Sequence, residues 1–126
     1  MQKEDLKTRT FRFFSKKNEK VIVVRSTNAR EFARWLDEQD WVAGYEVLVP
    51  LDRERVSMLR TSGIRQSYAK ENWCTDFCIH NSNGTRSIRE IIPKSSLEKR
   101  AEIEKLELSR RYWTSLGITD WKIVVV

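Results

Sequence analysis

Two acidic residues on neighbouring predicted strands are the best candidates for chemistry in this sequence. Asp76 lies in the segment WCTDFCIH and Glu90 in the segment RSIREII, and the residues NSNG between them are typical of a tight turn. The two segments therefore predict a hairpin in which both carboxylates converge at one end of the sheet. Carboxylate oxygens are the ligands that Mg²⁺ prefers, and a bound Mg²⁺ can activate water for attack on a phosphodiester. The alternative interpretation is a pair of surface acids near a turn.

The sequence also holds two cysteines, Cys74 and Cys78, close to its single histidine, His80. The further ligands of a zinc site are missing at the usual spacing. Two cysteines four positions apart on one strand are more typical of small core side chains in a reducing cytosol. The pattern therefore favours a structural role for both.

Basic residues outnumber acidic ones, and the formal net charge is +6. This balance suits a nucleic-acid partner, because Lys and Arg that neutralise phosphates supply affinity that does not depend on sequence. A row of charges on a helix is also typical of a solvated face. The candidates for contact with a DNA backbone are Arg53, Arg55, Arg60 and Arg65 in the polar segment 51–72, and Lys99 and Arg110 on the last predicted helix.

The first half of the chain predicts a hairpin, a helix and a long strand. In residues 11–24 the inward-facing candidates are Phe11, Phe13, Val21 and Val23, and KKNEK forms the turn. Residues 26–40 follow as a helix with an apolar stripe. The pair Asn28 and Glu31 has the spacing of a capping box, in which Asn28 caps the helix. Residues 41–51 read as a strand that Pro50 closes.

The second half begins with a short helix that ends near Gly63, before the hairpin that carries the two acids. Ser95 and Glu98 form a second capping box, which predicts a helix from there to Gly117. The last segment, WKIVVV, is apolar apart from Lys122 and is typical of a strand in the middle of a sheet. This order of elements predicts an α/β (α+β) fold in which helices flank a mixed sheet.

Length and hydropathy bound the organisation of the molecule. We expect residues 1–126 to form a single domain, with the polar residues 1–10 loosely held. No apolar run approaches the length of a membrane span, and the N-terminal segment lacks the apolar core of a signal peptide. The expected location is the cytoplasm, with no membrane partner.

The segment IREIIPKSSLEKRAEIEKLELSRRYWTSLGITDWKIVV resembles the TnsA family, the endonuclease subunit of heteromeric cut-and-paste transposases. The helix EKLELSRRYW is its most specific part, and CTDF and residues 26–51 resemble further segments of the family. The resemblance covers the chain from about residue 21 onward. It implies a restriction-endonuclease-like, PD-(D/E)xK fold that cuts the 5′ ends of a transposon with Mg²⁺ or Mn²⁺. It also implies DNA, a TnsB-like transposase and a TnsC-like ATPase as partners. The family's C-terminal domain, which contacts the ATPase, has no counterpart in this sequence.

By this resemblance, the family's metal-binding aspartate corresponds to Asp76 and its next metal ligand to Glu90. The helix glutamate corresponds to Ala29 and the catalytic lysine to Ile92. Alanine cannot hold a metal-bound water, and isoleucine cannot stabilise the negative charge that develops on the phosphate. Two neighbouring residues are weak substitutes, namely Glu31 for the missing carboxylate and Lys94 for the missing ammonium.

Three functions therefore remain open. The resemblance and the two losses favour an endonuclease-fold subunit that acts on DNA in transposition with impaired or lost catalysis. One alternative is an active Mg²⁺-dependent DNA endonuclease that uses Glu31 and Lys94 in displaced positions. The other is a non-catalytic module that binds DNA or docks a partner, including the case in which DNA has no role.

Overall fold

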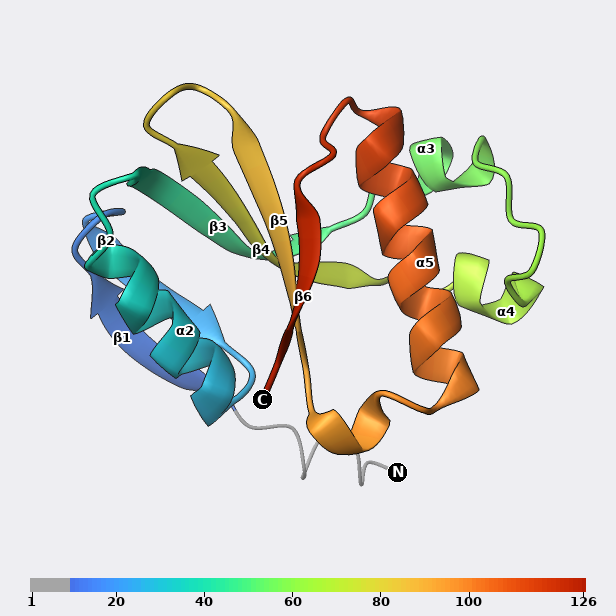
Figure 1. Ribbon diagram of the computed structural model, residues 1–126, viewed down its shortest axis with the longest axis horizontal. Coiled ribbons are helices and arrows are strands. Elements are labelled where there is room, and N and C mark those ends of the chain that lie inside the picture. Colours follow the sequence, from blue (N-terminus) through green and yellow to red (C-terminus); the bar gives the residue numbers. More distant parts are fainter. Residues whose placement is uncertain (1–9) are drawn as a thin grey trace.

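A four-stranded mixed sheet forms the middle layer of the molecule (Figure 1). The computed structural model describes residues 10–126. The sheet has the order β3 (Val42–Pro50), β4 (Cys74–Asn81), β5 (Arg86–Ile92) and β6 (Trp121–Val125). The first three strands pair antiparallel, and β6 pairs parallel to β5. This mixed α+β architecture, with helices packed alongside the sheet, confirms the predicted fold class.

A separate hairpin and one helix cover the first face of the sheet (Figure 1). The hairpin consists of β1 (Phe11–Ser15) and β2 (Lys20–Val24), and the helix α2 spans Thr27–Asp37. Together with the sheet they enclose a hydrophobic core. Its fully buried side chains include Ile22, Val24, Ala33, Leu36, Phe77 and Ile79.

The long helix α5 (Arg100–Ser115) covers the second face of the sheet (Figure 1). Two short helices, α3 (Arg53–Ser57) and α4 (Gln66–Ala69), lie on the outer side of α5 (Figure 1). The second core contains Leu51, Val56, Ile64, Cys78, Ile88, Leu108, Tyr112, Trp113 and Ile118. Successive residues of a strand point to opposite faces, so β4 sends Phe77 to the first core and Cys78 to the second. The predicted burial is confirmed for Cys78, whereas Cys74 at the start of β4 is only half-buried.

The sequence also led to expectations about residues 1–10 and about membrane-spanning helices. The expectation that residues 1–10 are loosely held falls, except for Thr10, outside the described residues. Among the helices that the structure describes, none is long and apolar enough to cross a membrane.

The predicted inward face of the first hairpin is correct on β1 and wrong on β2. Phe11 and Phe13 pack against the first core, but Val21 is exposed and its neighbour Ile22 is buried. Phe13 pairs with Ile22, and Phe11 pairs with Val24. Because side chains alternate along a strand, a register that differs by one residue moves the whole buried set to the other face.

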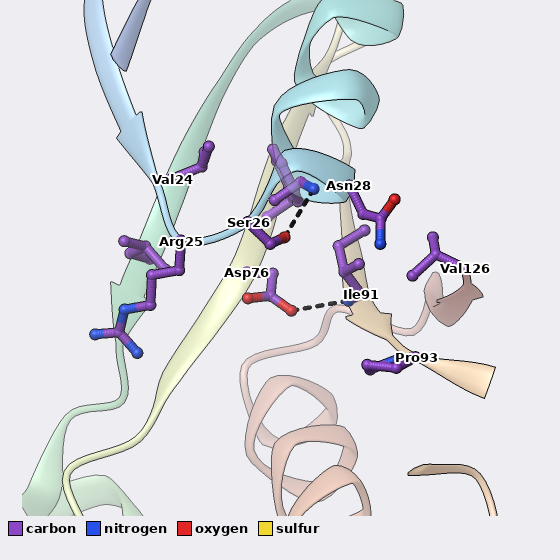
Figure 2. Close-up of a pocket in the computed structure, with 11 residues that line it drawn as sticks. Val24, Arg25, Ser26, Asn28, Asp76, Ile91, Pro93 and Val126 are labelled. Carbon is purple, nitrogen blue, oxygen red and sulfur yellow. Dashed lines mark hydrogen bonds between the residues drawn. The ribbon is translucent and has the colours of Figure 1, made fainter. Parts of the chain in front are cut away.

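The first helix begins two residues earlier than the capping pattern predicts. Ser26, and not Asn28, is the N-cap of α2, and its Oγ accepts a hydrogen bond from the Ala29 N–H at 3.0 Å (Figure 2). Asn28 and Glu31 lie inside the helix, so they do not form the predicted capping box.

We expect Ser26→Ala to lower the free energy of unfolding by about 1 kcal/mol, since it leaves one amide of the first turn without its cap. Asn28→Ala is the matched control and should change stability little. Urea unfolding of the two variants and the wild type measures the difference. An equal loss in both variants would contradict the observed cap.

The predicted second capping box is also wrong. Residues Lys94–Ser96 form a short 3-10 helix (η1), and α5 begins only at Arg100, with Lys99 as an N-cap that makes no side-chain hydrogen bond. The predicted end is correct, because Gly117 adopts a φ of +83°, a conformation that favours glycine after the last helical turn.

The last strand lies at an edge of the sheet and not in its middle. β6 pairs only with β5 among the strands described, and Ile123 and Val125 are exposed. The crossover through α5 brings the chain back beside β5, whose other edge β4 already occupies. An apolar run shows that a strand forms, but it does not show which neighbours that strand receives.

Candidate functional site

Asp76 and Glu90 come together where the backbone pairing of β4 and β5 ends. The paired residues run from His80–Arg86 to Phe77–Arg89, so Asp76 and Glu90 occupy the next position. The Asp76 N–H donates to Glu90 Oε1 at 2.9 Å, and the Ile91 N–H donates to Asp76 Oδ2 at 2.8 Å. The two carboxyl groups thus take the place of backbone carbonyls at the point where the strands separate.

Glu90 is deeply buried, and both of its carboxyl oxygens accept hydrogen bonds. Glu90 is only 1% exposed. Its Oε1 accepts a hydrogen bond from the Asp76 N–H, and its Oε2 accepts one from Ser109 Oγ at 2.6 Å. Ser109 Oγ in turn accepts from Trp121 Nε1 at 3.0 Å. Burial, together with the charge of Asp76, raises the pKa of Glu90 to about 8, against the lowering effect of the hydrogen bonds from Ser109 and Asp76. The carboxyl group of Glu90 is therefore mainly protonated at neutral pH.

Asp76 lies between two cavities, one toward each side of the sheet. The first, of about 230 Å³, is lined by Asp76 together with Arg25, Ala29 and Pro93 (Figure 2). The second, of about 200 Å³, is lined by Asp76 and Arg25 together with Glu90, Ile92 and Glu102. Asp76 therefore reaches both spaces from a single position on β4.

Burial raises the pKa of Asp76, while the Ile91 amide and the charge of Arg25 lower it and the charge of Glu102 raises it. Arg25 and Glu102 are site residues that the sequence did not reveal. Arg25 lies between β2 and α2, and Glu102 lies in the first turn of α5. No local pattern relates either residue to the hairpin of the two acids.

The backbone of β3 is also unusual beside Asp76. Leu48 has a φ of +49° and lines the first cavity. It lies between the pairs Val47–Phe77 and Val49–Thr75, and hence opposite Asp76. A positive φ is uncommon for a residue other than glycine, and such conformations concentrate at functional sites. Both neighbours of β4 are thus irregular at the level of Asp76.

The two positions that the resemblance assigns to lost catalytic groups both line these cavities. Ala29 lines the first cavity and Ile92 the second, and both side chains are buried. Neither supplies a polar atom. Each cavity therefore has an apolar side chain at the position where the resemblance expects a carboxylate or an ammonium.

The carboxylates present do not fit a Mg²⁺ ion. Magnesium needs near-octahedral oxygen ligands, whereas both oxygens of the buried Glu90 already accept hydrogen bonds, one from the Asp76 N–H and one from Ser109 Oγ. Within residues 10–126, the group of three or more side chains that could share a metal ion lies elsewhere on β3 and β4 and includes neither Asp76 nor Glu90. In this arrangement the carboxyl groups of Asp76 and Glu90 hydrogen-bond to the backbone of the neighbouring strand, where the pairing of β4 and β5 ends.

The two substitute residues lie away from Asp76. Glu31 is exposed on α2, where it bonds to Arg34 at 3.4 Å. It is two positions beyond Ala29, which rotates it about 200° around the helix. Lys94 is exposed at the start of η1, after Pro93 has ended β5. Neither lines a cavity beside Asp76.

The predicted DNA-contacting residues fall into two groups. Arg60 and Arg110 line one groove of about 490 Å³ between the α3–α4 segment and α5, which also contains Arg111. Arg110 and Arg111 both bond to Glu107, and Arg111 also donates to the backbone carbonyls of Arg60 and Ser62. Arg111 therefore holds the segment in place, and Arg60 faces the groove.

The remaining basic candidates are exposed and dispersed. Arg53 donates to the Glu71 carbonyl, and Arg65 lies beside Glu104 and over the Tyr68 ring. Arg55 lies in the last turn of α3, and Lys99 is the N-cap of α5. The α3–α4 segment, which carries most of them, lies on the outer side of α5 (Figure 1), and none of these four residues lines a cavity beside Asp76.

Compared with known proteins, the chain matches no protein-family model and no curated protein. What is established is the structure itself, a small mixed α/β domain with a four-stranded sheet.

Proposed function

We propose that this chain is a TnsA-like subunit with a restriction-endonuclease-like fold that acts on DNA in transposition and has lost most or all of its cutting activity. The observation that carries the proposal is the state of the acidic pair. Asp76 and Glu90 meet at the opening of the sheet, where a nuclease of this kind would bind its metal ion. Glu90, however, is buried, both of its oxygens accept hydrogen bonds, and its pKa is raised to about 8. We infer a former nuclease site whose acidic pair no longer offers its oxygens to a metal ion.

The exposed arginines of the α3–α4 segment support a role in contacting DNA. Arg53, Arg55 and Arg60 are exposed on one segment of the chain, and Arg60 lines a groove with Arg110. Positive charges in this arrangement bind a phosphate backbone without reading its sequence. By the same resemblance, the partners are a TnsB-like transposase and a TnsC-like ATPase in the cytoplasm.

We expect the triple variant Arg53→Ala/Arg55→Ala/Arg60→Ala to weaken binding to duplex DNA and to reduce its salt dependence. Each lost phosphate contact lowers the slope of log affinity against log salt by about 0.9. The matched control is Lys16→Ala/Lys17→Ala/Lys20→Ala, which removes the same charge from the β1–β2 turn region. Fluorescence anisotropy across a salt series measures both. Equal losses in the two variants would mean that only net charge matters.

A plasmid-nicking assay separates lost catalysis from an active enzyme. We expect the wild-type chain not to nick supercoiled DNA in Mg²⁺ or Mn²⁺. The double variant Ala29→Glu/Ile92→Lys supplies both missing groups at positions that line the cavities beside Asp76. If it nicks DNA, and if Asp76→Ala then abolishes nicking, the frame is that of a nuclease. Nicking by the wild type that depends on Asp76 would instead support the active endonuclease, and absence of DNA binding at low salt would refute a role with DNA.

A further inference from the structure

Three side chains of metal-binding types meet on one face of β3 and β4. The ligand atoms of Glu46, Cys78 and His80 all lie within 4.8 Å of one another. Cys78 and His80 alternate along β4 and so share a face, and Glu46 pairs with Cys78 across the two strands. Cys78 is buried, whereas the side chains of His80 and Glu46 are 45% and 60% exposed. The group therefore joins an inner sulfur to two outer ligands that solvent can reach.

We propose that Glu46, Cys78 and His80 bind one Zn²⁺ ion, or a similar divalent transition-metal ion, with water as the fourth ligand. Sulfur, imidazole nitrogen and carboxylate oxygen are the three ligand atoms that zinc takes from proteins. At the usual bond lengths, the ligand atoms around a tetrahedral ion stand about 3.3–3.6 Å apart. Glu46 Oε1 and His80 Nε2 are 3.0 Å apart, close to this value. Small rotations of these two exposed side chains would bring all three atoms to bonding distance of one ion.

The charges of the group also suit a divalent cation. A thiolate and a carboxylate together balance the charge of Zn²⁺, and the neutral imidazole adds a third ligand. Arg86 is the cation that faces the group, because it pairs with His80 across β4 and β5 and lies beside Cys78. Its charge opposes a second cation, and burial raises the pKa of the Cys78 thiol, so the metal ion must displace the thiol proton when it binds.

Spacing along the chain does not reveal this group. Zinc sites are usually recognised from ligands repeated at short intervals, and here only Cys78 and His80 are close in sequence. Glu46 joins them through the antiparallel pairing of β3 and β4. Spacing along the chain predicts no zinc site. The carboxylate of Glu46, on the neighbouring strand, raises the number of candidate ligands from two to three.

The test uses the full chain and the metal ions alone. Calorimetric titration with Zn²⁺ should show one ion per chain, and Co²⁺ should give the intense near-ultraviolet absorption of a cobalt–thiolate bond. We expect His80→Ala and Glu46→Gln to weaken Zn²⁺ binding by at least about tenfold, since even the loss of an outer-shell partner costs about 10–100-fold. Cys78→Ser should remove the cobalt–thiolate band.

Two controls make the assignment specific. Cys74→Ser changes the other cysteine, which lies outside the group, and Asp76→Asn changes the acid of the candidate nuclease site, so both should keep Zn²⁺ binding. If the buried Cys78→Ser variant fails to fold, the exposed His80→Ala and Glu46→Gln variants decide the question. Absence of Zn²⁺ binding, or binding that is unchanged in His80→Ala and Glu46→Gln, would overturn the proposal. Because no DNA is present, the result is independent of the proposed function.

Discussion

Replacing Glu90 by glutamine is expected to make the protein more stable than the wild type at pH 8 and to change its stability little at pH 4. The pKa of this carboxyl is about 8 in the folded protein, above its ordinary value of 4.5. As the pH rises between these values, the unfolded chain loses the proton while the folded protein keeps it. The folded wild type therefore loses stability across this window.

The size of this effect follows from the width of the window. Each pKa unit corresponds to about 1.4 kcal/mol, so the wild type loses several kcal/mol that the glutamine variant keeps. Glutamine can preserve the local contacts, because its amide oxygen can accept from the Asp76 N–H and its amide nitrogen can donate to Ser109 Oγ. Burial of Glu90, and not a missing hydrogen bond, is thus the property that the variant isolates.

Urea unfolding between pH 4 and pH 8 measures the difference between the two proteins. Glu31→Gln is the matched control, because it removes an exposed carboxylate and should give no such pH dependence. A stability difference between Glu90→Gln and wild type that stays constant from pH 4 to pH 8 would show that Glu90 is ionised in the folded protein. The candidate metal ligand would then be available, and the proposal of lost catalysis would rest on Ala29 and Ile92 alone.

The second large effect is the loss of stability expected when lysine replaces Ile88 or Ile92 of β5. Ile88 and Ile92 are both buried and both lie on the face of β5 that carries Glu90. Ile88 belongs to the second hydrophobic core, whereas Ile92 lines the cavity that contains Asp76, Glu90 and Glu102. We expect Ile88→Lys to cost about 3–5 kcal/mol or more, because it buries a charge without a partner.

Ile92→Lys should cost at most about half as much, since the introduced ammonium meets carboxyl groups that can ionise beside it. The new positive charge should also lower the pKa of Glu90 and so reduce the loss of stability toward pH 8. Denaturant unfolding of both variants at pH 6 and pH 8 tests this difference. Equal destabilisation at the two positions would show that the cavity beside Asp76 does not accept a catalytic lysine.

Local sequence patterns were sufficient for the hairpin that brings Asp76 and Glu90 together. The turn signal at NSNG and the flanking strand segments place the two acids opposite one another, as the structure shows. The end of α5 before Gly117 was equally clear, since a glycine with positive φ is a local requirement. Both results depend on interactions between residues that are near in sequence.

The sequence by itself therefore determined the mixed α+β class, the hairpin of the two acids and the burial of Cys78. Only the tertiary structure decided that β6 is an edge strand, that Ser109 bonds to Glu90 and Trp121 to Ser109, and that Arg25 and Glu102 line the cavities. It also decided that Glu46 joins Cys78 and His80. The physical reason is that the ionisation and ligand capacity of a side chain depend on its neighbours in space, and those neighbours come from segments far apart in the chain.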